Sequence, residues 1–152
     1  MADRLSIAKA GPGDRDDWLR LWGEWQRHMS GAVPDHITER TWDMIVAPQS
    51  GLFALLARNG SGALGMANAS STDFAWTAGP ILFLQDLYVT PEARGLGAGS
   101  ALLKNIYEEA DAIGAAQVFW MVDEDDPELQ GFYARHAIRT PYLRYMRRGW
   151  DW

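Results

Sequence analysis

The sequence predicts a single domain of the α/β class, with mixed α+β character. Three observations support this prediction. The chain has 152 residues, close to the usual size of one domain. Segments with the periodicity of strands alternate with segments that have the periodicity of helices, and no repeat or linker divides residues 1–152. With 47% hydrophobic residues, the chain can form one core without disulfides or structural metal.

The composition excludes several kinds of site. The chain has no cysteine, which excludes a thiol nucleophile, a redox dithiol and a cysteine-ligated metal site. A net charge of −6 argues against a nucleic-acid partner. Residues 1–30 carry charges throughout, and the longest apolar run, at 80–84, is far shorter than the ~20 residues that span a bilayer. We therefore expect a cytoplasmic protein with no membrane partner, and the scattered histidines predict no metal site.

The N-terminal half is expected to contain a strand, two helices and a hairpin. Polar and apolar residues alternate in the first segment, as in a strand. Acidic residues open the first helix, where the helix dipole favours them. Thr38 is the expected cap of the second helix, and Pro48 ends it. Asn59-Gly60-Ser61-Gly62 predicts the hairpin turn. The expected elements are a strand at 4–10, helices at about 14–29 and 37–47, and strands at 51–58 and 62–69.

The C-terminal half again alternates between strands and helices. Its first strand is the most apolar of the chain, and the glycine-rich turn RGLGAG leads from it into a helix that Gly114 ends. The expected elements are strands at 80–90, 116–122 and 140–148, a helix between 98 and 114, and a helix at 126–137.

The glycine-rich turn is the most informative motif. Gly95, Gly97 and Gly99 lack side chains, so a ligand can reach successive backbone amides, and the following helix adds partial positive charge. Arg94 adds a permanent cation and Ser100 a hydroxyl, which together suit a pyrophosphate or a similar dianion. A Walker loop would need a lysine before Ser100, and its absence sets that alternative aside. Two alternatives stay open for this turn: a Rossmann site, which would place Ser100 at the third glycine, and a flexible turn with a surface arginine.

The turn resembles the acyl-CoA loop of the GNAT superfamily of N-acetyltransferases, Arg/Gln-x-x-Gly-x-Gly/Ala, at each fixed position of residues 94–99. A second motif, from Asp126 to Phe132-Tyr133, is similar to the family's Asn-x-x-Ala-x-x-Phe/Leu-Tyr element, with Asp126 in place of Asn and Leu129 in place of Ala. The resemblance covers residues 81–148. It implies a mixed, mostly antiparallel central sheet with about four helices packed on both faces.

The resemblance implies an enzyme that moves the acetyl group of acetyl-CoA directly to a primary amine of a small molecule or amino acid, in a ternary complex. The alternatives are a protein or peptide N-acetyltransferase, a non-catalytic acyl-CoA-binding module and, more distantly, a Rossmann oxidoreductase. The family is often dimeric, so a homodimer is expected, and Trp150 and Trp152 could cover either a partner or the chain's own core. The resemblance implies that acetyl-CoA contacts Leu87, Tyr88, Val89, Arg94, Gly95, Leu96, Gly97, Ala98, Gly99, Ser100, Asp126 and Tyr133.

Two residues are candidates for catalysis. Asp86 is a carboxylate within the most apolar strand, where it is costly without a purpose. It is the expected base, and the alternative is a structural acid that pairs with an arginine or caps backbone amides. Strict alternation would place Asp86 on the face of Leu82 and Leu84, unless a bulge shifts the strand. The resemblance implies that Tyr133 donates to the leaving thiolate; the alternative is a core tyrosine.

The acceptor site is the least defined part of the prediction. The candidates that could bind the amine are Trp25, His28, Gln85, Asp86 and Trp120. Trp25 belongs to a helical stripe with Trp18 and Trp22, which forms either a core or an acceptor pocket. The strand also resembles that of diamine acetyltransferases, but Gln85 replaces an acid there, which disfavours a polyamine acceptor.

Overall fold

The structure is a computed structural model that describes residues 4–149. Trp150 and Trp152, the two candidates for covering a partner or the core, lie outside the described residues. The chain divides after Trp120 into two compact units, residues 4–120 and residues 121–149. Each unit is described by itself.

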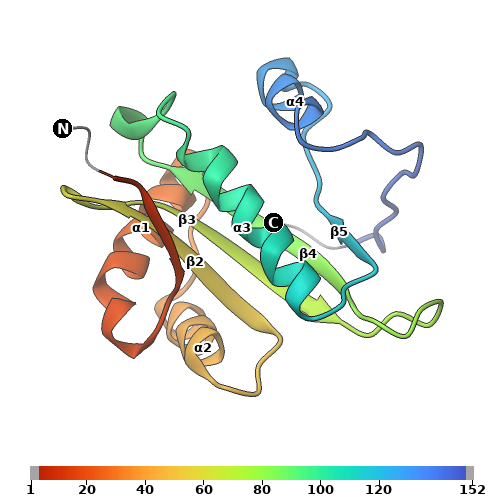
Figure 1. The fold of residues 1–152 in the computed structure, drawn as a ribbon, viewed down its shortest axis with the longest axis horizontal. Coiled ribbons are helices and arrows are strands. Elements are labelled where there is room, and N and C mark those ends of the chain that lie inside the picture. Colours follow the sequence, from red (N-terminus) through yellow and green to blue (C-terminus); the bar gives the residue numbers. More distant parts are fainter. Residues whose placement is uncertain (1–3, 150–152) are drawn as a thin grey trace. The chain divides into compact units, whose positions relative to one another are not determined.

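The first unit contains a five-stranded sheet in the order β1-β2-β3-β4-β5 (Figure 1). The first three neighbouring pairs are antiparallel, and β4 and β5 are parallel. This confirms the predicted mixed, mostly antiparallel sheet. The strands are β1 Ser6–Lys9, β2 Leu52–Asn59, β3 Gly62–Thr72, β4 Ile81–Val89 and β5 Gln117–Phe119.

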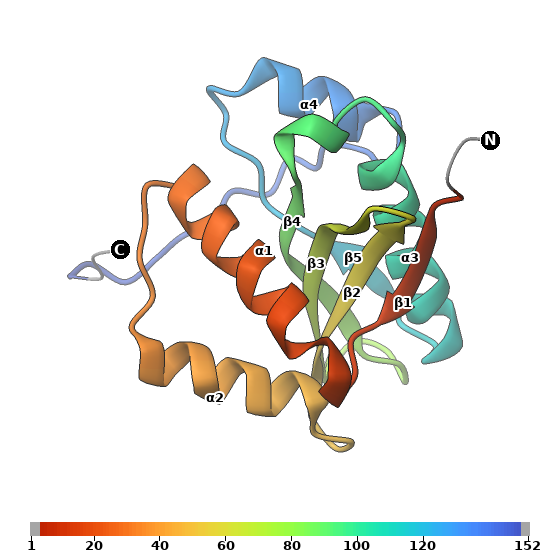
Figure 2. The same cartoon turned by 90° about the vertical axis from the view of Figure 1, so that its left-hand side faces the viewer.

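Helices cover both faces of this sheet. Figures 1 and 2 show α1 and α2 on one face and α3 on the other. The helices of the first unit are α1 Arg15–His28, α2 Asp35–Val46 and α3 Ala98–Ala112, and short 3-10 turns at Pro12–Asp14 and Pro91–Ala93 precede α1 and α3. The second unit contributes α4, Pro127–Ala134. The four predicted helices are therefore confirmed within the described residues.

The core between the sheet and the first two helices is built around tryptophan. Trp18 is fully buried, and its ring stacks on Trp22 at 5.4 Å and lies 5.5 Å from Trp42 of α2. Leu56 and Met66 of the sheet are also fully buried in this cluster. Trp18 and Trp22 of the predicted stripe therefore form core.

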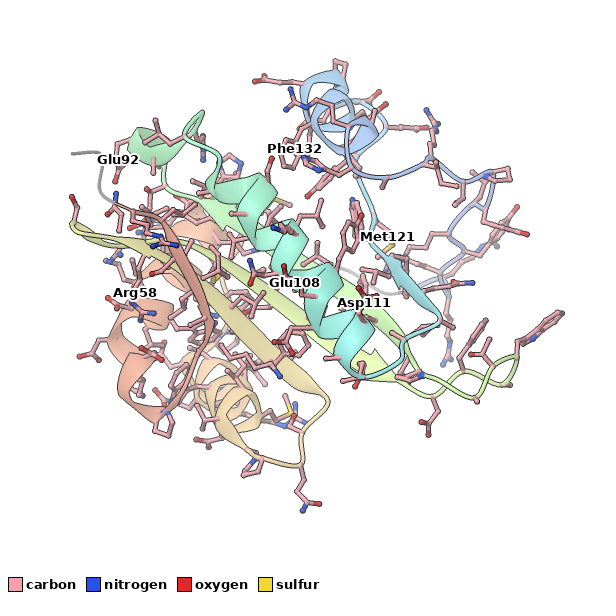
Figure 3. All side chains as sticks on the ribbon, viewed as in Figure 1. Arg58, Glu92, Glu108, Asp111, Met121 and Phe132 are labelled. Carbon is pink, nitrogen blue, oxygen red and sulfur yellow. The ribbon has the colours of Figure 1, made fainter. Side chains whose placement is uncertain are left out.

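Two contacts join α1 to its neighbours in the fold. Arg58 of β2, labelled in Figure 3, binds Asp14 at 2.6 Å and Asp17 at 3.0 Å, which ties the start of α1 to the sheet. The expected cap of α2 at Thr38 is wrong, because the helix begins three residues earlier, after Pro34. The hydroxyl of Thr38 accepts a hydrogen bond from the Trp22 indole instead (3.2 Å).

A β-bulge at Gln85 changes which face of the sheet Asp86 lies on. Asp86 pairs with Asn68, but Leu84 already pairs with Ala69, so Gln85 is an extra residue in β4. Paired residues share a face in an antiparallel sheet. Asp86 therefore lies on the α1 face with Asn68, and Leu84 lies on the opposite face. The expectation from strict alternation, that Asp86 shares a face with Leu82 and Leu84, is wrong for this reason.

The C-terminal strands are shorter than predicted. Of the segment 116–122, only Gln117–Phe119 pairs with β4, and Phe119 stacks on Phe83 at 5.0 Å. The predicted strand at 140–148 is wrong, because the described part of the chain has no strand there. An alternating pattern forms a strand only beside a hydrogen-bonding neighbour. Without such a neighbour, Tyr142, Leu143 and Tyr145 are exposed.

Candidate active site

Asp86 accepts hydrogen bonds on both carboxylate oxygens. The Trp25 indole of α1 donates to Oδ1 at 2.8 Å, and Asn68 Nδ2 of β3 donates to Oδ2 at 3.0 Å. The Trp18 indole in turn donates to Asn68 Oδ1 at 3.0 Å. If Asp86 were a structural acid, the sequence would lead us to expect that it pairs with an arginine or caps backbone amides. The structure instead gives it two side-chain donors, and no lysine or arginine among residues 4–149 forms an ion pair with it.

The surroundings of Asp86 favour a carboxylate that can take up a proton. Burial raises the pKa of Asp86 above its ordinary value, and the hydrogen bonds from Asn68 and Trp25 partly oppose this rise. A general base works best when its pKa lies near the operating pH. A raised carboxyl pKa therefore suits proton removal near neutrality.

Trp25, whose indole donates to this carboxylate, belongs to a cluster of three aromatic rings. Trp25 and His28 of α1 have ring centroids 5.8 Å apart, and Tyr88 of β4 lies 5.9 Å from Trp25 and 6.1 Å from His28. The Tyr88 hydroxyl donates to Glu24 at 3.2 Å. Burial, and next the charge of Glu24, raise the pKa of Tyr88, so this phenol keeps its proton. Aromatic faces and carboxylates together attract an ammonium group.

The glycine-rich turn leaves its backbone accessible. Gly95 has φ +78° and Gly97 has φ +88°, which lie in the left-handed region that favours glycine. A Cβ at either position would meet no atom within 4 Å. Arg94 is exposed, and its Nε donates to the carbonyl of Val89 at 3.1 Å. Its guanidinium therefore lies near the end of β4, 5.8 Å from the ring of Tyr88, on the residue that directly precedes Gly95.

The strand and helix on either side of this turn also offer backbone groups. β5 pairs with β4 only over Ile81–Phe83, so in the described chain no strand lies beside this edge of β4 at Leu87, Tyr88 and Val89. After the exposed side chain of Leu96, helix α3 begins at Ala98, and the first amides of a helix have no acceptor within it. Gly99 and Ser100 lie in this first turn. These residues are among those that the resemblance assigns to acetyl-CoA, together with Asp126 and Tyr133.

In the second unit, α4 carries the other predicted motif. Asp126 caps this helix, because its Oδ1 accepts a hydrogen bond from the backbone amide of Leu129 at 2.9 Å. Burial raises the pKa of Tyr133 to about 12. Its ring packs edge-on against Phe132 at 5.1 Å. Asp126 thus has a structural role, and Tyr133 is a phenol that stays protonated near neutral pH.

Two predicted acceptor residues make their described contacts away from Asp86. Gln85, the bulged residue, is exposed, and its amide donates to the Ser70 hydroxyl at 2.9 Å. Trp120 lies 6.4 Å from the ring of Tyr107 on α3. Among the predicted acceptor residues, Trp25 therefore contacts Asp86 directly, and His28 packs against Trp25.

The sequence reasoning missed Asn68 and the role of Trp18. Asn68 is 2% exposed and lies in β3 among residues that are buried on both sides of it. The sequence does contain a clue to Asn68, because it is the one amide side chain within the small, apolar run Ala63–Ala69. Asp86 was identified as a candidate for the same reason, a polar side chain within an apolar strand.

The described residues contain no group of three His, Asp or Glu side chains that could hold a metal ion. Over the same residues, no helix is long and apolar enough to cross a membrane.

Residues 16–137 match the acetyltransferase (GNAT) family. The chain belongs to this family. It is therefore an acyltransferase, and the predicted family and enzyme class are confirmed. Over 150 residues it is 29% identical to the D-amino-acid N-acetyltransferase HPA3 of Saccharomyces cerevisiae, a match that covers 97% of this chain and 93% of the yeast protein.

Two solved structures confirm the GNAT fold. The aminoglycoside N-acetyltransferase AAC(6')-Iy in complex with CoA has a TM-score of 0.84 at 18% identity, with 98% of this chain and 97% of that chain covered. The ribosomal-protein-alanine N-acetyltransferase from Brucella melitensis biovar Abortus 2308 has a TM-score of 0.75 at 18% identity, with 95% and 99% covered. At these identities the likeness concerns the fold alone.

Proposed function

We propose that this GNAT protein transfers the acetyl group of acetyl-CoA directly to the primary amine of a small molecule, with free amino acids as the favoured class. The observation that carries the proposal is the Asp86 carboxylate on the strand that leads into the glycine-rich turn. It accepts from the Trp25 indole, whose ring packs with those of His28 and Tyr88. The similarity to a yeast D-amino-acid N-acetyltransferase supports the amino-acid class. A homodimer and a cytoplasmic location remain predictions.

The residues of the turn suit an anionic, nucleotide-bearing co-substrate. Gly95 and Gly97 leave open space over the backbone, and Arg94 presents a cation there. We assign the pyrophosphate to Arg94 and the amides of residues 95–100, and the pantetheine arm to the open edge of β4 at 87–89. Bound acetyl-CoA supplies an acetyl thioester, whose C–S bond breaks as the amine nitrogen forms the new C–N bond.

Asp86 acts as the base in this proposal. An amine with a lysine-like pKa of about 10.4 costs about 4.6 kcal/mol to deprotonate at pH 7, so a nearby proton acceptor lowers the barrier. Asp86 takes the first proton that the ammonium group loses, either directly or through one water, and the second leaves the nitrogen for solvent after the C–N bond has formed. Trp25, His28 and Tyr88 bind the ammonium form before this transfer.

Tyr133 assists the departing sulfur as a hydrogen-bond donor. Because burial raises its pKa to about 12, full transfer of its proton to a thiolate of pKa ~8.5 is uphill by roughly 5 kcal/mol. A hydrogen bond to the sulfur as charge develops requires no such transfer. The thiolate takes its proton finally from solvent.

The test begins with binding. Acetyl-CoA and CoA should raise the Tm of the protein and NAD should not, because a ligand that binds only the folded state stabilises it. Release of free thiol is then followed over a panel of D- and L-amino acids, aminoglycosides, polyamines and peptides. Turnover with free amino acids is the expected result.

Each other outcome has a distinct meaning. No stabilisation by either CoA species would overturn the proposal. Stabilisation without consumption of any amine would indicate a non-catalytic binding module, and turnover with peptides alone would indicate a peptide N-acetyltransferase.

A further inference from the structure

The amide of Asn68 is oriented by one neighbour and directed at another. Its Oδ1 accepts from the Trp18 indole at 3.0 Å, and its Nδ2 donates to Asp86 Oδ2 at 3.0 Å. An indole N–H can only donate, so the amide oxygen has to face Trp18. The amide nitrogen consequently has to face Asp86. Trp18 is fully buried and Asn68 nearly so, which shields both hydrogen bonds from bulk solvent.

We propose that Asn68, oriented by Trp18, is a positioning residue that holds the Asp86 carboxylate ionised and directed toward the acceptor amine. The inference rests on the proposed function. Burial favours the neutral form of a carboxyl, whereas an N–H directed at an oxygen favours the charged form. Asn68 supplies that N–H from a buried position on β3. Trp25 supplies the second, on Oδ1.

The charged groups near this site do not replace Asn68. From α1, Glu24 accepts from Tyr88 of β4 at 3.2 Å and pairs with Arg20 at 2.9 Å. His28 packs against the rings of Trp25 and Tyr88. The guanidinium of Arg94, after β4, lies 5.8 Å from the Tyr88 ring. In the described chain none of these groups forms an ion pair with Asp86, so the two N–H donors are what holds its charge.

The main test is the variant Asn68→Leu, which keeps the side-chain shape and removes the donor. The acid limb of kcat/KM for the amine should move to higher pH by about one unit or more, because a hydrogen bond to a charged group is lost. On the alkaline plateau kcat should approach the wild-type value, and the Kd of acetyl-CoA should not change. A uniform fall in kcat with an unmoved acid limb would overturn the proposal.

Trp18→Phe is a second variant in the same chain of hydrogen bonds from Trp18 through Asn68 to Asp86. It leaves Asn68 in place and frees its amide to rotate, so the acid limb should move in the same direction by a smaller amount. The matched control is Trp22→Phe, which removes the indole bond to Thr38 (3.2 Å) on the same helix and should leave the acid limb unmoved. If Asn68→Leu does not fold, the contrast between Trp18→Phe and Trp22→Phe decides; equal effects would overturn the proposal.

Carbon-13 NMR titration of the Asp86 carboxyl gives a readout that does not depend on turnover. Its pKa should rise in Asn68→Leu and in Trp18→Phe. If it rises in a protein that acetylates no amine, the proposed function fails and the role of Asn68 in ionisation stands. If the enzyme is active and this pKa is unchanged in both variants, the inference fails and the proposed function stands.

Discussion

Asp86 shows how a single buried charge can be held for chemistry. An ionised carboxyl away from water is costly unless donors surround it. One indole of α1, from Trp25, and one amide of β3, from Asn68, supply them here, and the Trp18 indole holds that amide in place. The carboxyl pKa is still raised, because burial outweighs the two hydrogen bonds. The buried charge of Asp86 therefore lowers the stability of the fold at neutral pH, and the same burial raises the affinity of its carboxylate for a proton.

The pH dependence of the free energy of unfolding should reveal the stability lost when the buried Asp86 ionises. The folded protein binds the Asp86 proton more tightly than the unfolded chain, whose pKa is near 3.8, so the stabilising contribution is full below that value and is lost as pH rises through the raised pKa. Asp86→Asn does not titrate. Its free energy of unfolding relative to wild type should therefore increase from about pH 4 to about pH 7 in urea denaturation. A difference that is constant with pH would contradict the burial of a charged Asp86.

Tyr133→Phe should lower kcat by tenfold or more, in the range of general-acid effects, while acetyl-CoA affinity holds. With a pKa of about 12, the wild-type phenol does not lose its proton at ordinary assay pH, so it should cause no basic limb in that range. Steady-state kinetics on both enzymes measure this, with Tyr142→Phe, an exposed tyrosine, as control. An unchanged kcat would remove Tyr133 from the mechanism.

Individual residues differed in how far the sequence could predict them. Asp86 and Arg94 were predicted because charge within an apolar strand, or before a glycine-rich turn, is unusual in a local pattern. Asn68 and Trp18 were missed because their importance depends on contacts with residues 18 and 50 positions away. The direction of Gln85 depends on one extra residue in β4, and sequence alone does not show where a bulge lies, so its role in acceptor binding stays a prediction.

At the level of elements, the turn between β4 and α3 combines accessible backbone with one cation. Its conformation depends on glycine, because Gly97 caps α3 with φ +88°. Gly97→Ala should destabilise the fold by roughly 1–3 kcal/mol through backbone strain alone, since its Cβ meets no atom within 4 Å. Gly13→Ala is the matched control, because its Cβ also meets nothing and its φ is not positive. Equal Tm changes for the two variants would argue against this reading of the turn.

Arg94→Ala should raise the KM for acetyl-CoA by roughly tenfold and leave kcat nearly unchanged, because a charge-assisted contact is lost without change to the reacting groups. Arg40→Ala, an exposed arginine on α2, is the control. The wild-type KM should also rise with salt more steeply than that of Arg94→Ala. A KM that stays constant in Arg94→Ala would contradict the pyrophosphate assignment.

The elements themselves were predicted well where their pattern is long. The helices α1 and α3 and the hairpin of β2 and β3 have the expected positions, because periodicity and turn chemistry act locally. The segment at 140–148 was predicted as a strand and is none, since pairing depends on a neighbour that the sequence does not specify. For the same reason β5 is shorter than the strand predicted at 116–122.

For the whole molecule, the net charge of −6 is compatible with an anionic co-substrate, because Arg94 and backbone amides act over a few ångströms. The absence of cysteine limits the reaction to transfer without a thiol-borne acetyl-enzyme. That residues 1–152 act as one acetyltransferase domain remains a prediction.

The most direct test of the account is mass spectrometry of the product formed from acetyl-CoA and a free D- or L-amino acid. Wild-type protein should yield the N-acetylated amino acid and one equivalent of free CoA, with no acetyl group left on the protein. Asp86→Asn should yield it at a rate about 10²–10⁴-fold lower with unchanged acetyl-CoA affinity, whereas Asp43→Asn, an exposed acid on α2, should match wild type. An N-acetylated product formed equally fast by Asp86→Asn, or none from any amino acid, would contradict the account.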